Sequence, residues 1–397
     1  MEFPLSFSMM TSQGVGEGCI PDALDALPSD AQLIVLVCSV LVNREELMAH
    51  ARRRFPGTAL HASTSCLGAM TDEGVHLGDD VVMAVAFSDP DGSYGTAVGG
   101  EADGSLSALA ATLLERARLQ ADRPGEQPGL VWVSAAPGTE EAVIGALDRL
   151  LGGQVPIYGG SSADNDISGC WWVADGRQTV PGGVLLSVLY PEADVLHAFH
   201  SGYEPAGILG RVTASEGRTL LAIDGRPAAQ VYNDSTGGVM DAYLSGGNVL
   251  GASTLYPLAI VVGEVNGVPY HRLIHPETMR ADGALTLFAE APDGAEVVLM
   301  RGDEQSLLTR AGRVAKAALA VDGGGLEDVV GGLVTYCAGC MLAVQDNIGA
   351  AHASLTGALP GVPFLGQFTF GEQGTFPNGE SCHGNLMIST VLFRAVA

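Results

Sequence analysis

The strongest constraint on the fold is a pattern that occurs three times: a short apolar segment that runs into small and polar residues. The last copy spans residues 366–374 (GQFTFGEQG), and similar stretches span residues 62–71 and 159–165. Glycine lets the backbone turn tightly and approach a bound group closely. We therefore expect three loops at strand ends that together build one polar pocket, although glycine-rich turns without a ligand have the same composition.

The order of strand and helix patterns indicates an internal repeat. The series strand, helix, strand, helix, strand, loop, strand occurs over residues 81–190 and again over residues 297–393. The loops at 159–165 and 366–374 fall at equivalent points. The predicted fold class is therefore α/β, with two related mixed-sheet halves and a cleft between them, a common place for a small-molecule site.

Apolar periodicity places the individual elements. Strands are predicted at 33–39, 59–63, 81–87, 131–134, 155–158, 170–173, 183–190, 258–263, 270–274, 285–288, 296–300, 333–336, 363–370 and 385–393. Helices are predicted at 44–55, 108–119, 140–151, 305–321 and 341–359. The strands at 170–173 and 183–190 are expected to pair around a turn at 175–176. The passage after residue 207 has the composition of a linker.

Composition limits the class of protein and its partners. A chain of 397 residues with 47% hydrophobic residues is globular and long enough for two or three domains. The net charge of −26 repels nucleic acid and anionic lipid. No run of 18 apolar residues is present, and the N-terminus lacks a basic region before an apolar one, so we expect a cytoplasmic protein without a membrane span.

Seven scattered cysteines argue against a disulfide framework. Cys337 and Cys340 form a C-x-x-C pair at a predicted strand-to-helix turn, and Cys382 and His383 follow near the last strand. Together these four soft ligands would suit Zn²⁺ or Cu(I), and the cysteine pair alone would suit redox chemistry. The alternative is that the cysteines are buried or line a pocket. Metal ligation therefore stays open at this point.

Haem would need one neutral imidazole in an apolar cavity. The histidines nearest the recognisable motifs are His200, His352 and His383. No C-x-x-C-H attachment sequence is present, so any haem b would be bound without a covalent link. No cofactor is required by the sequence itself.

The three loops supply groups that suit an amino-acid-like ligand. Glu372 and Asp164 could accept hydrogen bonds from an amine, and helix N-termini near 138–139 and 340–341 could receive a carboxylate. Alternatively, the two acids only cap turns. The predicted ligand-binding residues are Ser65, Cys66, Ser161, Ser162, Asp164, Asn165, Cys337, Cys340, Gln367, Glu372, Gln373, His383 and Asn385.

Enzyme signatures are scarce. The sequence contains no G-x-S-x-G elbow, P-loop or H-E-x-x-H motif. Cys66 or Cys337 could pair with His383 as a nucleophile and base, but nothing in the sequence places them together. We therefore expect a protein without catalytic activity.

Several motifs resemble the FIST sensory domain family. They are residues 159–164 (GGSSAD), 212–217 (VTASEG), 223–228 (IDGRPA) and the tail at 366–390. The most specific parts are Tyr336–Gly339, Phe370–Gln373 and His383. The resemblance covers most of the chain. It implies an N-type domain over 1–225 and a C-type domain over 226–397. It also implies a sensor of bacterial signal transduction that binds amino acids or related metabolites, or haem and nitric oxide in one subgroup, and acts on a separately encoded histidine kinase or cyclase.

Overall fold

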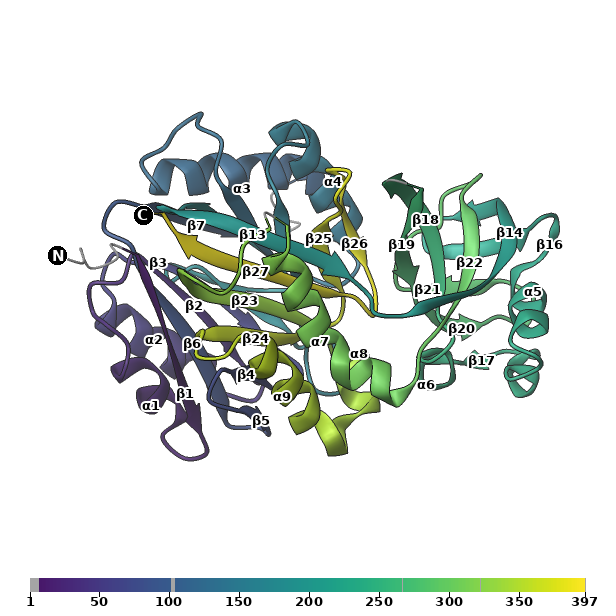
Figure 1. Cartoon of the computed structure of the whole chain (residues 1–397), viewed down its shortest axis with the longest axis horizontal. Helices are drawn as coiled ribbons and strands as arrows, with labels where there is room; N and C mark the ends of the chain where they lie inside the picture. The colour runs from purple at the N-terminus through teal and green to yellow at the C-terminus, as the bar shows by residue number, and fades with distance from the viewer. Residues whose placement is uncertain (1–6, 101–103, 266, 322, 397) are drawn as a thin grey trace.

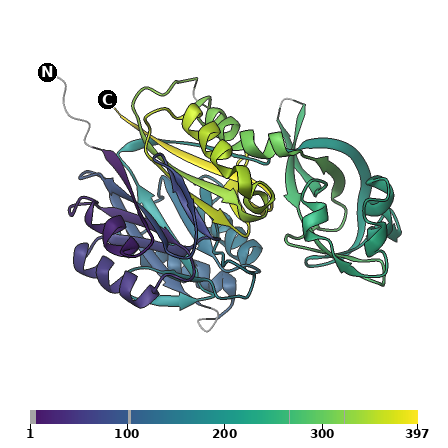
Figure 2. The ribbon, with the colours of Figure 1, turned by 90° about the horizontal axis from the view of Figure 1, so that it is seen from below.

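The computed structural model describes residues 7–100, 104–265, 267–321 and 323–396. Over these residues the chain forms a body of three six-stranded mixed sheets and, at one end of it, a separate nine-stranded unit (Figure 1). Helices lie on the outside of the body, and the three sheets face one another inside it (Figure 2).

Each sheet of the body is built mainly from one segment with a shared element order: strand, helix, strand, helix, strand, hairpin, strand. Repeat 1 consists of β1 (Ser8–Val15), α1 (Cys19–Asp25), β2 (Leu33–Cys38), α2 (Arg44–Arg54), β3 (Ala59–Thr64), β4 (Gly68–Thr71), β5 (Val75–Leu77) and β6 (Val81–Ser88). Repeat 2 consists of β7 (Ser93–Gly99), α3 (Leu106–Gln120), β8 (Leu130–Ala135), α4 (Glu140–Leu151), β9 (Ile157–Ser161), β10 (Trp172–Ala174), β11 (Thr179–Pro181) and β12 (Val184–Tyr190).

Repeat 3 has the same order, but a long insertion separates its first strand from its first helix. It consists of β13 (Ala193–His200), α7 (Glu304–Leu319), β23 (Val329–Cys337), α8 (Ala338–Ala343), η3 (Gln345–Asn347), α9 (Ile348–Ala358), β24 (Phe364–Thr369), β25 (Glu372–Thr375), β26 (Ser381–Gly384) and β27 (Ile388–Ala395).

The hairpin of each repeat leaves its own sheet and extends the sheet of another repeat. Strands β4 and β5 continue from β24, strands β25 and β26 continue from β9, and strands β10 and β11 continue from β3. The three repeats are therefore interlocked in a closed cycle. In each sheet the central pair is parallel and the returning strand is antiparallel.

Burial on both faces explains why the central strands read as continuous apolar runs. In β2, Ile34 and Leu36 pack with the core beneath α1 and α2, whereas Val35 and Val37 face the central core shared by the repeats. A buried polar contact also joins two sheets: His61 of β3 contacts Ser187 Oγ through Nδ1 (2.7 Å) and Ser134 Oγ through Nε2 (2.9 Å). Burial lowers the pKa of His61 to about 3, so its imidazole is neutral.

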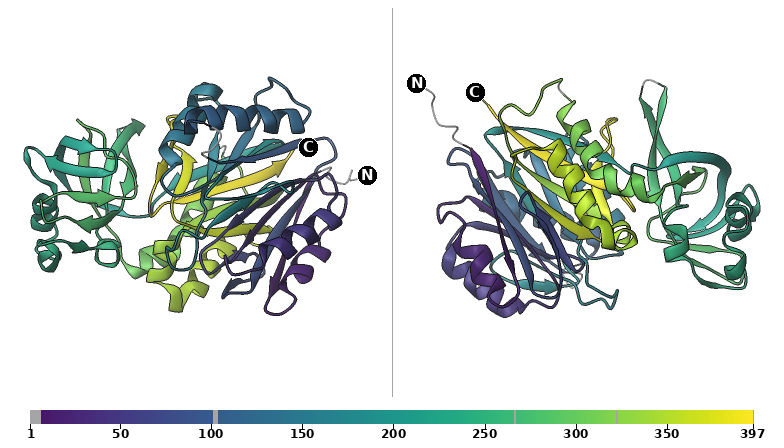
Figure 3. Two further views of the ribbon diagram at one scale, coloured as in Figure 1. Left: turned by 180° about the vertical axis from the view of Figure 1, so that it is seen from behind. Right: turned by 60° about the horizontal axis from the view of Figure 1, so that its bottom comes forward.

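The insertion folds as a separate β-rich unit (Figure 3). It has its own apolar core. It consists of β14 (Glu204–Glu216), β15 (Thr219–Ile223), β16 (Arg226–Pro227), α5 (Ala228–Ser235), η2 (Asp241–Tyr243), β17 (Gly247–Asn248), α6 (Leu250–Ser253), β18 (Leu258–Val265), β19 (Val268–Ile274), β20 (Pro276–Met279), β21 (Leu285–Leu287) and β22 (Glu296–Arg301). Ala259, Leu273 and Met300 of this unit pack into the central core of the body. The insertion is therefore anchored to the body by apolar contacts.

The predicted α/β class with related mixed-sheet units is confirmed, and the structure adds repeat 1 to the two copies that the sequence indicated. Four local predictions were wrong. The strand at 81–87, which the sequence indicated as the first strand of the earlier copy, is β6 of repeat 1, whereas repeat 2 begins with β7. Strand β10 pairs with β11 and β3, not with the strand at 183–190. The supposed linker after residue 207 is part of β14, and the helix expected over 341–359 is divided into α8, η3 and α9. Among the described helices, none has the length and apolar character that crossing a membrane requires.

Replacing Gly159 with alanine is expected to lower the free energy of unfolding by roughly 3 kcal/mol or more. Gly159 has a φ of 141°, and a Cβ there would overlap the backbone carbonyl of Val133 on the neighbouring strand. Gly145→Ala is the matched control, because it lies in α4 with only Arg149 nearby at 3.5 Å. We expect the control to be neutral or to stabilise by about 0.5–1 kcal/mol. Urea unfolding of both variants tests this, and equal stabilities would contradict the packing described.

Candidate ligand-binding cavity

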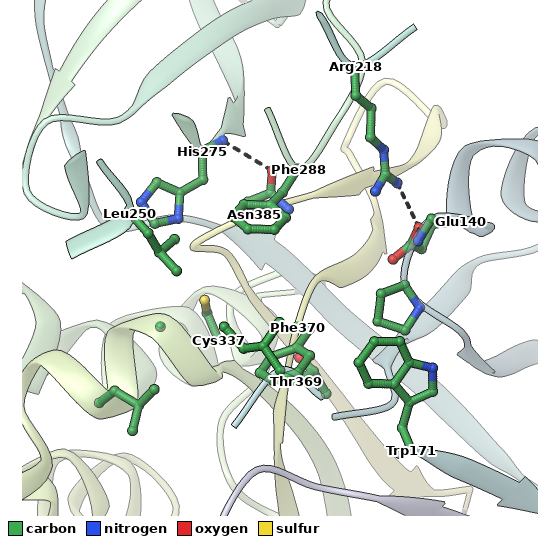
Figure 4. A pocket seen from close by; sticks show the side chains of 15 residues that line it. Glu140, Trp171, Arg218, Leu250, His275, Phe288, Cys337, Thr369, Phe370 and Asn385 are labelled. Carbon is green, nitrogen blue, oxygen red and sulfur yellow. Dashed lines mark hydrogen bonds and ion pairs between the residues drawn. The ribbon is translucent and has the colours of Figure 1, made fainter. Parts of the chain in front are cut away.

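A cavity of about 270 Å³ lies between the inserted unit and the body, where several strands of the body end (Figure 4). The body contributes residues at or after the ends of β8, β9, β23, β24 and β26: Pro137, Gly138, Glu140, Ile167, Trp171, Cys337, Gly339, Leu342, Thr369, Phe370 and Asn385. The inserted unit contributes Arg218, Leu250, His275 and Phe288. The position at the carboxyl ends of parallel strands is a usual one for ligands in α/β proteins.

Most of the cavity wall is apolar, and much of it is aromatic. Trp171 and Phe370 meet edge to face with their ring centroids 6.0 Å apart. On the opposite side, the rings of His275 and Phe288 lie 6.1 Å apart. Leu250 and Leu342 complete the apolar lining. Such a wall favours a ligand with a planar apolar body.

His275 places a buried imidazole on the wall of the cavity. Its side chain is 3% exposed, and its Nε2 has no hydrogen-bond partner within the described residues. Its backbone N–H donates to Asn385 Oδ1 (3.1 Å), which fixes the residue against the body. Burial lowers the pKa of His275 to about 4, so the imidazole is neutral at neutral pH. A buried polar atom without a partner is costly, and a ligand group would relieve that cost.

An ion pair between the inserted unit and the body forms one edge of the cavity. Arg218, in the turn between β14 and β15, donates from Nη2 to Glu140 Oε2 (2.6 Å) and also pairs with Glu141. Glu140 is buried and also accepts from Ser161 Oγ and from the backbone N–H of Gly138, both at 2.6 Å. The N-terminus of α4 therefore already holds a carboxylate of the protein. A ligand carboxylate, predicted near 138–139, would compete with Glu140 there.

The three glycine-bearing loops do converge. The N–H of Cys66 donates to Phe368 O (3.0 Å), that of Ala163 to Thr64 O (3.1 Å), and that of Ser161 to Gly371 O (2.8 Å). Thr64, Ser161 and Thr369 occupy equivalent register positions at the ends of β3, β9 and β24. The loop ends thus form a closed hydrogen-bonded centre beside the cavity.

Two of the predicted ligand residues, Cys337 and Asn385, line the cavity. The others lie outside its lining: Ser65, Cys66, Ser161, Ser162, Asp164, Asn165, Cys340, Gln367, Glu372, Gln373 and His383. Asp164 accepts from the backbone N–H groups of Ile167 and Gly169 in its own loop (2.6 and 2.7 Å). Glu372 accepts from Thr369 Oγ1 and from the N–H of Met387, and burial raises its pKa. Both acids are therefore occupied by internal contacts, and their amine-binding role stays a prediction.

The histidines predicted as haem ligands lie in separate parts of the structure. His383 contacts Phe288 O through Nε2 (3.2 Å), and His352 contacts Thr71 O (2.7 Å). His200 lies on β13, outside the lining of this cavity. Within the described residues, His, Cys, Asp and Glu side chains do not gather in any group of three or more that could hold a metal ion. The set of Cys337, Cys340, Cys382 and His383 is thus not assembled as a metal site here, and haem stays a prediction.

Comparison with known proteins places the chain in a family. The FIST N domain model matches residues 32–226, and the FIST C domain model matches residues 228–375. An uncharacterized protein of Methanocaldococcus jannaschii is 29% identical over 104 residues, which cover 26% of this chain and only 20% of that protein. The structure of PurLQS from Thermotoga maritima aligns over 76% of this chain and 73% of its own, with 11% identity and a TM-score of 0.23, too low for an argument.

The two family matches meet between residues 226 and 228, inside the sheet of the inserted unit. A domain division at residue 225 therefore stays a prediction. FIST domains are sensor domains of signal transduction. Because the two matches together cover most of the sequence, the chain belongs to the FIST family.

Proposed function

We propose that this FIST protein is a cytoplasmic sensor of bacterial signal transduction that holds one small metabolite in the cavity between its body and its inserted unit. The observation that carries the proposal is the aromatic-walled cavity of about 270 Å³, on whose wall His275 Nε2 has no hydrogen-bond partner among the residues that the structure describes. An apolar cavity with a few fixed polar groups is the usual form of a small-molecule site. The chemistry is binding without turnover.

The cavity favours one kind of amino-acid-like metabolite. The rings of Trp171, Phe288 and Phe370 suit an aromatic side chain. The carboxylates of Glu140 and Glu141 face the single guanidinium of Arg218, so this edge carries an excess of negative charge. A ligand carboxylate is disfavoured there and an amine is favoured. We therefore propose an aromatic amine, with one polar group that hydrogen-bonds to His275.

The position of the cavity also supports a signalling mechanism. A ligand that contacts His275 and Phe288 on one side and Trp171 and Phe370 on the other joins the inserted unit to the body. Its binding energy would favour one relative orientation of the two. A separately encoded protein, such as a histidine kinase or a cyclase, would recognise that orientation.

Titration with tryptamine, tyramine, phenethylamine and their parent amino acids tests this proposal. We expect at least one amine to bind with one-to-one stoichiometry by calorimetry and to change the fluorescence of Trp171. His275→Ala should weaken that binding about tenfold through the lost hydrogen bond. His271→Ala on β19 is the matched control, since His271 lies outside the cavity lining. Binding by no member of the panel, or equal weakening by both variants, would overturn the proposal.

A further inference from the structure

A buried arginine behind the cavity is paired with a cysteine. The side chain of Arg310, on α7, is 0% exposed, and its Nη1 lies 3.1 Å from Cys340 Sγ. Its Nη2 donates to Met387 O (2.7 Å), and its guanidinium lies over the rings of Tyr203 (5.7 Å) and Tyr336 (5.1 Å). Among the residues that the structure describes, no carboxylate oxygen forms an ion pair with the Arg310 guanidinium within 4 Å. Since a buried cation needs a counter-charge, the thiolate of Cys340 is the group placed to supply it.

The surroundings of Cys340 favour the thiolate. Burial alone would raise the pKa of Cys340, but the hydrogen bond from Cys337, the charge of Arg310 and contact with the Tyr203 hydroxyl (3.5 Å) together lower it to about 6. The pKa of Cys337 is raised well above its ordinary value, chiefly by its hydrogen bond to Cys340 and by burial. The pair thus holds one proton, on Cys337, and one negative charge, on Cys340.

The two cysteines occupy the N-terminal turn of one short helix, α8. Cys337 is the N-cap residue of α8, and Cys340 is the third residue of the same helix. Side chains at these two positions approach each other, as they do in a capping box. Cys337 lines the cavity, whereas Cys340 is 0% exposed behind it. A reagent that enters the cavity therefore meets Cys337 first.

We propose that Cys337 and Cys340 form a dithiol site that reacts with hydroperoxides admitted through the cavity. The proton of Cys337 passes to the Cys340 thiolate. The Cys337 thiolate then attacks the peroxide oxygen that carries the hydrogen. The O–O bond breaks, Cys337 becomes a sulfenic acid, and the leaving alkoxide takes the proton from Cys340. The Cys340 thiolate then attacks the Cys337 sulfur, the disulfide forms and hydroxide leaves. Two electrons pass from the sulfurs to the peroxide, which is released as an alcohol, or as water from hydrogen peroxide.

Formation of the disulfide would remove the thiolate that balances the charge of Arg310. This change would occur close to the two connections between the body and the inserted unit. Tyr203 lies directly before β14, where the chain enters the inserted unit, and Gly302 lies directly after β22, where it leaves. A Cβ on Gly302 would lie 2.6 Å from the Tyr203 ring, so the two connections are closely packed. Oxidation of the cysteine pair would therefore change the packing around Arg310 and Tyr203, where the inserted unit joins the body. This activity goes beyond metabolite sensing and needs no metabolite.

The test is treatment of the folded protein with hydrogen peroxide or cumene hydroperoxide, followed by alkylation of the remaining thiols and peptide mass mapping. The exposed Cys170 is first replaced by serine so that it does not react. We expect both alkylation sites at Cys337 and Cys340 to be lost, with a mass decrease of about 2 Da for their peptide. The buried Cys38 and Cys66 should keep their alkylation sites and serve as internal controls.

The single variants separate the two roles. In Cys340→Ser, which also removes the base that accepts the Cys337 proton, the sulfenic acid on Cys337 should form more slowly but persist and be trapped by dimedone. Cys337→Ser should give neither disulfide nor adduct. If a variant does not fold, peptide mass mapping of the protein with both cysteines still shows whether the Cys337–Cys340 disulfide forms. The proposal is overturned if Cys337 and Cys340 remain alkylatable after peroxide treatment of the folded protein, or if their disulfide forms only after unfolding.

Discussion

Replacing Arg310 with methionine is expected to lower the free energy of unfolding by about 3–5 kcal/mol at pH 8. Methionine matches much of the volume of the arginine stem but leaves the Cys340 thiolate buried without a counter-charge. It also removes the donor to Met387 O and the cation between Tyr203 and Tyr336. Breaking a buried pair by removing one partner is among the most costly single changes.

Urea unfolding of Arg310→Met beside Arg313→Met measures this effect. Arg313 lies on the same helix but is exposed, so its replacement should change the stability by no more than about 0.5 kcal/mol. The pH dependence follows from Cys340, whose pKa is about 6 when folded and 9.0 in the ordinary thiol. A lowered folded-state pKa gives stability that is fully present above pH 9 and is lost as the pH falls towards 6. The difference between wild type and Arg310→Met should therefore be larger at pH 9 than at pH 6, and a constant difference would contradict the thiolate pair.

Leu342→Trp is expected to weaken binding of the aromatic amine by roughly 100-fold, about 2.7 kcal/mol. Leu342 lines the cavity on α8 but is 44% exposed, so a larger side chain can fill the ligand space without overpacking the core. The stability of the variant should change by no more than about 0.5 kcal/mol.

Leu150→Trp is the matched control for this variant. Leu150 is 48% exposed on α4 and lies outside the cavity lining, so the control should bind like wild type. Calorimetric titration and urea unfolding of both variants give the two readouts. Unchanged affinity in Leu342→Trp, with the fold intact, would show that the ligand binds elsewhere.

The repeats could be recognised from the sequence where no insertion interrupts the order of strands and helices. Repeat 2 is continuous, and its strand-end loop at 159–165 could be matched with the loop at 366–374. The first strand of repeat 3, β13, was not recognised from the sequence, because residues 204–303 are inserted between it and α7. A strand of the insertion, β22, was taken for that first strand. Strand β14 was missed because its first five residues are exposed and include Pro205 and Gly207, which are typical of loops.

Some cavity residues of the body could be predicted from sequence motifs. The cavity residues of the inserted unit could not be predicted. Cys337 was found as part of the C-x-x-C pair, and Asn385 because it lies in the tail at 366–390. His275 and Phe288 come from connections inside the inserted sheet, and their approach to Cys337 depends on a tertiary contact that no local pattern encodes. The only available signal was a histidine directly after an apolar strand, at Ile274–Pro276. Arg310 gave no signal, since an arginine at a helix position is usually exposed.

The most direct test of the account is a crystal structure of the protein grown with the aromatic amine that binds best in the titrations. The account predicts that the ligand ring lies against Trp171 and Phe370, and that one polar atom of the ligand lies about 2.7–3.2 Å from His275 Nε2. A structure in which that amine occupies another surface, while the space between His275 and Trp171 holds only water, would contradict it.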